Sequence, residues 1–361
     1  MTVRLLPVPR LDTLDAPSGW MYEGIHRILQ AYLLHLHGNT DGLPAVDALR
    51  AHAARSGAID ITYFVAAQAD DTAESVVGYA RVDLPLRANL TTAVIMAVVH
   101  PDRRRAGIGT QLADRAEQTA ADRGRTSWIT EAECREPAPG EPTLTVAGGD
   151  PVPASEPGLI FTLARGYTLR QVARRSRLDL PVPEDTLTPL CDEASERAGT
   201  YRLHQWQGLP PAEWLPKIAA LTTAMSTDPP LGDLTMEEDP WDADRVREVI
   251  EHRLSQGRDA LTTAAEDPAT GDLVAVTDID ILGRDRADAD QGDTIVRQDH
   301  RGHHLGMAIK IANLRQLREL YPGVQRLYTW NASENAHMLA INTALGFYPA
   351  SGSATLQRGD K

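Results

Sequence analysis

Two stretches of the chain share one order of apolar and polar segments. In the first, apolar or alternating runs at residues 60–69, 75–84 and 91–99 predict three β-strands. An arginine-rich turn and an amphipathic helix to about residue 123 follow, and residues 127–133 predict the next strand. This first stretch therefore predicts an α/β arrangement.

The second stretch repeats that order. Its predicted elements are strands at residues 259–266, 273–282 and from 293, a helix to 320, a strand at 324–330, a helix at 334–345 and final strands from 346. The turn at residues 267–272 carries Pro and Gly in favourable places.

Helical segments precede the strands in each half. They are expected at residues 20–37, 44–55, 211–226 and 242–255. Asp242 suits the N-cap of the last of these, and Gly257 suits its C-terminal end.

The two stretches indicate an internal duplication. Gly109 and Gly306 occupy matching places 197 positions apart, and the pair Gly166-Tyr167 matches Gly346-Phe347. The first half is longer between these landmarks, in a Pro- and Gly-rich stretch at 134–158 that predicts a loop insertion. We expect an N-terminal domain at 1–182, a linker at 183–199 and a C-terminal domain at 200–361.

Composition narrows the class of protein. A net charge of −14 disfavours nucleic-acid binding, and no apolar run is long enough to span a bilayer. The N-terminus lacks the apolar core of a signal peptide, and two cysteines fit a reducing compartment. We expect a cytoplasmic protein, monomeric or homodimeric, without a metal.

The segment HPDRRRAGIG at residues 100–109 carries the first chemical signal. It follows an apolar strand and precedes a helix, so its glycines and the helix N-terminus favour binding of an anion such as a diphosphate. The second half has RGHHLG at residues 301–306, where His304 stands at the place of the middle glycine.

Both halves resemble the GNAT superfamily of acyl-CoA N-acyltransferases, in its tandem actinobacterial form. The resemblance depends on the strand, the Arg-x-x-Gly-x-Gly turn, the helix and the later Gly-aromatic pair. Residues 335–347, an Asn-led helix ending in Gly-Phe, resemble the family's second CoA-binding motif. The fold class implied is α/β (α+β), with two GNAT-like domains that each have a mixed, mostly antiparallel sheet flanked by helices.

The resemblance implies acetyl-CoA, or another acyl-CoA, as the acyl donor and a small-molecule amine as the acceptor. The CoA-binding positions implied in the second half are Thr294, Ile295, Val296, Arg301, Gly302, His303, His304, Leu305, Gly306, Met307, Ala308, Asn331, Asn335 and Met338. Those implied in the first half are Ala97, Val98, Val99, Arg104, Arg105, Ala106, Gly107, Ile108, Gly109 and Thr110.

The usual tyrosine acid of the family is missing. Asn342 takes its place in the second half and Thr162 in the first, so Tyr348 or water is left to protonate the thiolate. Asp293, at the start of the central strand, is the candidate that faces the acceptor, although it also suits a strand-start turn. Because the first half has nearly lost its Asn-led helix, we expect the second half to be catalytic.

Several other residues have two interpretations. Asp278 and Asp280 alternate on one strand face and either line the cleft or lie on the surface, as do Glu131 and Glu133. Asn335 either caps a helix or binds the pantetheine arm.

Three functions remain in view. The leading hypothesis is an N-acyltransferase that uses direct attack of the amine on the thioester. The alternatives are a catalytically silent acyl-CoA-binding module or regulatory pseudoenzyme, and an unrelated αβ protein whose two loops match by chance.

Overall fold

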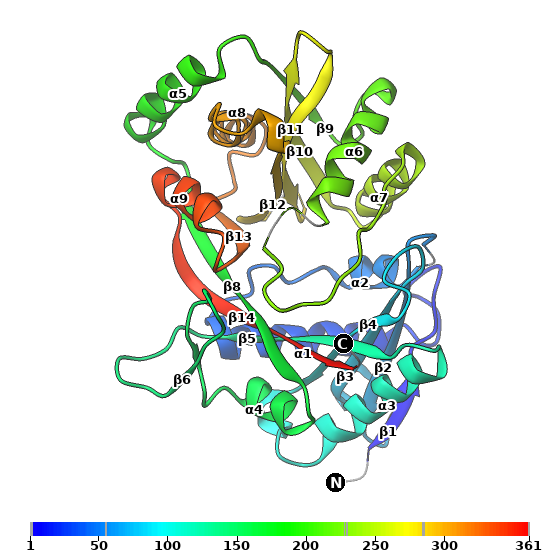
Figure 1. The fold of residues 1–361 in the computed structure, drawn as a ribbon. Helices are drawn as coiled ribbons and strands as arrows, with labels where there is room; N and C mark the ends of the chain where they lie inside the picture. The colour runs from blue at the N-terminus through cyan, green and yellow to red at the C-terminus, as the bar shows by residue number, and fades with distance from the viewer. Residues whose placement is uncertain (1–2, 55, 227, 229, 284–285, 360–361) are drawn as a thin grey trace.

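The computed structural model describes residues 3–54, 56–226, 228, 230–283 and 286–359. Within these residues, twelve strands form one continuous sheet in the order β1-β2-β3-β4-β5-β14-β8-β13-β12-β11-β10-β9 (Figure 1). The order is palindromic, because each strand of the first half has a counterpart in the second. The predicted mixed sheet with flanking helices is confirmed.

The strands of the sheet follow the repeated pattern of the sequence. They are β1 (Arg4–Pro7), β2 (Ile59–Ala67), β3 (Val76–Pro85), β4 (Thr92–Val99), β5 (Ser127–Cys134), β8 (Thr168–Asp179), β9 (Arg202–Gln207), β10 (Asp259–Asp267), β11 (Asp272–Ile281), β12 (Asp288–Val296), β13 (Arg326–Ala332) and β14 (Tyr348–Gly359). A separate pair, β6 (Thr143–Leu144) and β7 (Val152–Pro153), lies inside the expected insertion.

The helices also occur in matching order. They are α1 (Trp20–His37), α2 (Val46–His52), α3 (Ile108–Asp122), α4 (Pro157–Ala164), α5 (Glu184–Ala198), α6 (Leu215–Met225), α7 (Ala243–Ser255), α8 (Leu305–Leu320) and α9 (Ala336–Leu345). Asp242 caps α7 as expected, because its side chain accepts a hydrogen bond from the backbone N–H of Arg245. The helix expected at 44–55 ends at His52, and Arg55 lies outside the described residues.

The two halves exchange their last strands. Strand β14, from the end of the chain, pairs with β5 of the first half, and β8 of the first half pairs with β13 of the second. The two exchanged strands also pair with each other, from Tyr348 opposite Arg177 to Gln357 opposite Thr168. Leu356 of β14 consequently packs in a first-half core beside Leu159 and Tyr167.

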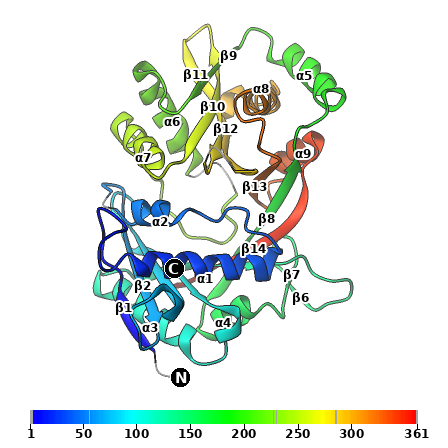
Figure 2. The same cartoon turned by 180° about the vertical axis from the view of Figure 1, so that it is seen from behind.

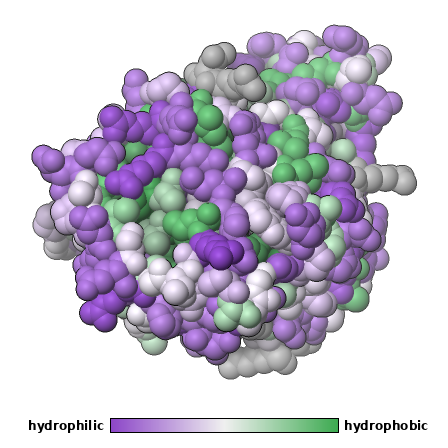
Figure 3. Space-filling view, turned by 90° about the horizontal axis from the view of Figure 1, so that it is seen from above, coloured by the Kyte–Doolittle hydropathy of each residue, from purple (hydrophilic) through white to green (hydrophobic). Residues whose placement is uncertain are grey.

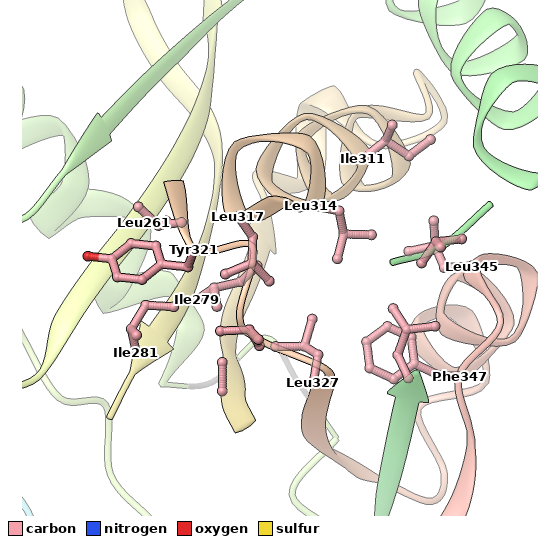
Figure 4. Close-up of a cluster of buried hydrophobic side chains, with 14 of the residues drawn as sticks. Leu261, Ile279, Ile281, Ile311, Leu314, Leu317, Tyr321, Leu327, Leu345 and Phe347 are labelled. Atoms are coloured by element: carbon pink, nitrogen blue, oxygen red, sulfur yellow. The ribbon is translucent and has the colours of Figure 1, made fainter. Parts of the chain in front are cut away.

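Helices cover both faces of the sheet, as Figures 1 and 2 show from opposite sides. In the second half, α8 packs on β10 and β11 from one side, and α6 covers β11 and β12. Figure 4 shows the core under α8, where Leu314 and Leu317 face Ile279 of β11 and Leu327 of β13. This packing fixes β11 and β12, which carry the site described below.

Two loops reach across between the halves. In the α1–α2 loop, Asp41 accepts hydrogen bonds from Arg326 at 2.5 and 2.8 Å and from the hydroxyl of Tyr328 at 2.7 Å. In the α6–α7 loop, the backbone N–H of Glu237 donates to Asn89 at 2.8 Å. Each half therefore positions a loop against the other half.

The segment expected as a linker contains helix α5, which packs on α8. The division of the chain into domains at 1–182 and 200–361 stays a prediction, since the sheet runs through both parts. No helix among the described residues is long and apolar enough to cross a membrane. Figure 3 shows a mostly hydrophilic face with hydrophobic side chains in a few patches.

Candidate active site

A β-bulge interrupts strand β12 in the second half. Thr277 of β11 pairs with Thr294, and Ile279 pairs with Gln291, so Gly292 and Asp293 together face the single residue between them on β11. The parallel pairing of β12 with β13 runs only from Asp288 to Asp290. Beyond Asp290 the two strands are no longer paired. We call the region between the unpaired parts of β12 and β13 the wedge, and the bulge lies at its start.

The first half has the wedge without the bulge. Strands β4 and β5 pair over Thr92 to Val94 only. The pairing of β3 with β4, by contrast, continues without a shift from Asp83 opposite Val94 to Gly78 opposite Val99. The two halves thus differ at the position where a bulge would turn backbone N–H groups toward the wedge.

Asp278 lies directly over the bulge. Its Oδ1 accepts a hydrogen bond from the backbone N–H of Asp293 at 3.1 Å. Nη1 of Arg253 on α7 lies 3.6 Å from Oδ2 of Asp278 and 3.7 Å from Oδ1 of Asp280. Arg258 donates to Oδ2 of Asp280 at 2.7 Å. The structure therefore brings together three acidic residues that sequence analysis singled out.

Burial sets the protonation of these carboxyls. It raises the pKa of Asp278 to about 7, against the opposing effect of Arg253. Asp293 is exposed at the surface of the cavity that it lines, but nearby protein atoms remove part of its water, and this desolvation raises its pKa as well. Burial also raises the pKa of Asp290 to about 6. A carboxyl with a pKa near 7 is suited to act as a general base at neutral pH.

The two phosphate-type loops share one backbone geometry. In the second half, Gly302 and His304 adopt left-handed φ angles of 85° and 55° directly before α8. In the first half, Arg105 and Gly107 do the same with 63° and 76° before α3. Such a turn at a helix N-terminus directs N–H groups to one side, which suits a phosphate.

Their arginines differ in what they contact. Across the described residues, the side chains of Arg104 and Arg105 make no hydrogen bond or ion pair. In the second half, Nη2 of Arg301 donates to Oδ2 of Asp228 at 2.9 Å, and Gln298 donates to Oδ1 of the same carboxylate at 2.8 Å. The first loop is thus open, whereas a carboxylate of the α6–α7 loop already occupies the second.

The first turn of the helix after each loop packs closely against neighbouring side chains. We call this close contact the seam. A β-carbon at Gly306 would lie 3.3 Å from Cδ1 of Ile341 and 3.8 Å from Cγ2 of Val296. At Gly109, the corresponding distances are 3.6 Å to Val99 and 3.8 Å to Phe161. A large side chain at either glycine would push into the space between the loop helix and the following helix.

The expected asparagines meet in the second half. Nδ2 of Asn342, which is 2% exposed, donates to Oδ1 of Asn331 at 2.8 Å. Oδ1 of Asn342 has no hydrogen-bond partner among the described residues. Asn335 caps α9 by accepting from the N–H of Met338 at 3.2 Å. That side-chain oxygen is therefore engaged in the helix cap.

Tyr348 lies away from this group. Its hydroxyl donates to Asp179 at 3.1 Å, its ring faces Arg177, and the side chain is 42% exposed. These contacts place it on the exchanged strands rather than beside Asp293. Its role as the acid stays a prediction.

Two other expected positions, Val296 and Thr294, make contacts close to the second loop and the bulge. Val296 borders the seam at Gly306, and Thr294 shares a 2.8 Å hydrogen bond with Thr277. His300 contacts Tyr201 at 2.6 Å. The hydroxyl of Tyr201 therefore holds the histidine directly before the loop.

Sequence analysis missed the basic partners of this site. Arg253 lies on α7 and Arg258 lies just after it, and no sequence motif connects either residue with β11. Lys310 of α8 was missed as well; burial lowers its pKa to about 7, and its ammonium lies 5.9 Å from the ring centre of Phe347. The signal available in the sequence was a lysine among the mostly apolar residues of the buried face of α8.

Part of the chain is similar to a known protein family. Residues 29–139 match the model of the acetyltransferase (GNAT) family. This part of the chain thus has the sequence pattern of a GNAT acetyltransferase domain. A mycothiol acetyltransferase from Sanguibacter keddieii is 28% identical over 302 residues, which cover 82% of this chain and 82% of that protein.

Solved structures show the tandem arrangement. A tandem GNAT protein from the clavulanic acid biosynthesis pathway superposes with a TM-score of 0.75 and 25% identity, covering 99% of this chain and 98% of that one. A GCN5-related N-acetyltransferase from Sphaerobacter thermophilus matches with a TM-score of 0.58 and 13% identity, over 98% and 95% of the two chains, which shows the fold alone. The chain therefore resembles a tandem GNAT protein along nearly its whole length, as its duplicated sequence indicates.

Proposed function

We propose that this protein transfers an acetyl group from acetyl-CoA to the primary amine of a small molecule, and that the second half performs the reaction. The observation that carries the proposal is the position of Asp278 over the β12 bulge, where the wedge between β12 and β13 begins. The matching position in the first half is Arg81, which cannot accept a proton.

The residues present fit an acyl-CoA. The left-handed turn at Gly302 and His304 and the N-terminus of α8 supply N–H groups for the diphosphate. Arg301 supplies a cation once its contact with Asp228 is released. When bound, acetyl-CoA supplies the thioester carbonyl that the amine attacks.

Asp278 has the first chemical task. A primary amine is mostly protonated at neutral pH, and a carboxylate with a pKa near 7 can take up one of its protons. Asp293 lies beside it and adds negative charge that attracts the ammonium group. The neutral amine then forms the new C–N bond as the C–S bond breaks.

The departing sulfur needs one proton. Asn342 stands where the family has a tyrosine, and an amide can donate a hydrogen bond without giving up its proton. We therefore assign Asn342 a role in holding Asn331, and we assign the proton to the amine nitrogen or to water.

One observation favours the alternative of a silent acyl-CoA-binding module. Asp228 already pairs with Arg301, so the second loop presents a carboxylate where a diphosphate would bind. In that case the first half, with its open loop, would hold the CoA.

Release of the CoA thiol in the presence of acetyl-CoA and a panel of amines tests the proposal. Wild type and Asp192→Asn, an exposed carboxylate on α5, should turn over equally, and Asp278→Asn should lose at least 100-fold in kcat. Binding of acetyl-CoA without turnover of any amine would support the silent module instead.

A further inference from the structure

A cavity lies beside the carboxylates of the second half. It has a volume of about 180 Å³ and lies between helices α6 and α7 and strands β9 to β12. Its apolar lining includes Trp206, Ile218, Trp241, Val249, Leu254 and Ile295. Asp278 and Asp293 line the same cavity, so one space contacts both apolar walls and the candidate base.

Two fixed indole rings contribute to the apolar walls. Trp206 packs against Trp214 with ring centres 5.2 Å apart. Trp241 lies 4.1 Å below the guanidinium of Arg245, which forms an ion pair with Asp239 at 2.6 Å. Because both rings are held by neighbours, they present a preformed flat surface, which suits an apolar or aromatic body.

The polar part of the site carries unequal charge. Among the described residues, the carboxylates of Asp278, Asp280 and Asp293 lie near the guanidiniums of Arg253 and Arg258, and the amine of Lys310 also interacts with Asp278. Burial lowers the pKa of Lys310 to about 7. With that amine neutral and all three carboxyls ionised, the group has an excess of one negative charge. A single ammonium group would balance it, whereas a polycation would bring charges that the apolar walls cannot pair.

Size limits the ligand further. Pockets for drug-sized ligands occupy roughly 300–1,000 Å³, so a cavity of about 180 Å³ fits a smaller molecule. An amino sugar would place several hydroxyls against Val249, Leu254 and Ile295, where they would lose hydrogen bonds to water. A compact monoamine has no such groups to desolvate.

The first half lacks this combination. Positions 197 residues before Asp278 and Asp293 hold Arg81 and Met96, and Arg81 pairs with Asp83 at 2.9 Å. A cation is not attracted to that arginine. The ammonium-binding arrangement therefore belongs to the second half.

We infer that the acceptor is a primary monoamine with a compact apolar or aromatic body, bound in this cavity with its ammonium group at Asp278 and Asp293. The inference rests on the proposed function and names its substrate class. It adds that the cavity walls, rather than the interface between the halves, select the acceptor.

The test compares three probes: phenethylamine, glucosamine and spermidine. Initial rates of CoA release give kcat/KM for each, in wild type and in Val249→Trp, which fills the cavity. Glu251→Trp, on the exposed part of the same helix, is the matched control. Calorimetric titration of phenethylamine measures binding independently of turnover.

We expect kcat/KM for phenethylamine to exceed that for the other amines at least tenfold. Val249→Trp should lower kcat/KM for phenethylamine at least tenfold, and Glu251→Trp should leave it unchanged. Faster turnover of glucosamine or spermidine, or an unaffected Val249→Trp, would overturn the inference and leave the acetyltransferase standing. Binding of phenethylamine that Val249→Trp abolishes, without turnover, would keep the ligand class and overturn the proposed function. Neither binding nor turnover would overturn both.

Discussion

A β-carbon on residue 292 would lie 2.3 Å from Oδ2 of Asp278, so the bulge of β12 accommodates this carboxylate only because Gly292 has no side chain. That close approach connects a backbone irregularity to the candidate base. The position of the Asp278 carboxylate therefore depends on residue 292 being a glycine.

Gly292→Ala should therefore displace Asp278 from the bulge. We expect kcat to fall at least tenfold and the free energy of unfolding to fall by about 1–3 kcal/mol, since a packed neighbour must move. Gly323→Ala is the control, because a β-carbon there has no neighbour within 4 Å. Equal rates for the two variants would show that Asp278 does not depend on the bulge.

The raised pKa of Asp278 predicts a pH-dependent change in stability. The folded protein holds a proton on this carboxyl up to about pH 7, whereas the unfolded chain loses it near 3.8. Its stabilising contribution is present at low pH and is lost as the pH rises through 7. Asp278→Asn, which stays neutral, should thus be more stable than wild type at pH 8 by on the order of 1 kcal/mol.

Chemical denaturation at pH 4 and pH 8 checks this sign. The difference between variant and wild type should fade toward pH 4, and Asp192→Asn should show none at either pH. A variant that is less stable than wild type at pH 8 would mean that the ion pair with Arg253 outweighs the cost of burying the charge.

Release of Arg301 predicts tighter binding of CoA. In Asp228→Asn the amide no longer holds Arg301 with a negative charge, nor repels the phosphates, so the Kd for acetyl-CoA should fall about 3- to 10-fold. Asp233→Asn removes a charge from the same loop without that contact and serves as the control. Calorimetry that finds weaker binding in Asp228→Asn would assign this carboxylate a supporting role in the site.

The exchanged strand predicts that the end of the chain stabilises the first half. Leu356 is fully buried among Leu159, Tyr167 and Val172. Leu356→Ala should lower the free energy of unfolding by about 2–5 kcal/mol and increase hydrogen exchange in β5. The exposed Leu320→Ala should have little effect. Faster hydrogen exchange that is confined to the second half would contradict the claim that the exchanged strand β14 stabilises the first half.

The sequence predicted the local elements well because their periodicity is local. Helix α1 spans residues 20–37 as expected, and β4, β5 and α8 agree within a residue or two. Strand β12 begins five residues before the expected start at 293. Its first part, DADQG, is mostly polar and lacks the apolar run of a buried strand. Ala289 packs in the core, but Asp288 and Asp290 lie near Arg286 and Arg258.

Long-range features were beyond the sequence. Strand β14 pairs with β5, for example at Leu356 and Thr130. The local sequence of a strand does not indicate in which half of the protein it will pair. For the same reason Arg253 was missed, since its partner Asp278 lies on another element. The phosphate loops were found because a turn between a strand and a helix is local.

The central claim is that the second half performs the acetyl transfer, and turnover of Gly306→Trp compared with Gly109→Trp tests it most directly. Each indole would fill the seam after one loop, at Ile341 or at Phe161, and leave the other half unchanged. Melting curves first show that each variant is folded, with Gly306→Val as a milder replacement. We predict that Gly306→Trp loses at least 100-fold in kcat/KM for acetyl-CoA and that Gly109→Trp retains activity within threefold. Loss of turnover in Gly109→Trp alone would contradict the account and assign the reaction to the first half.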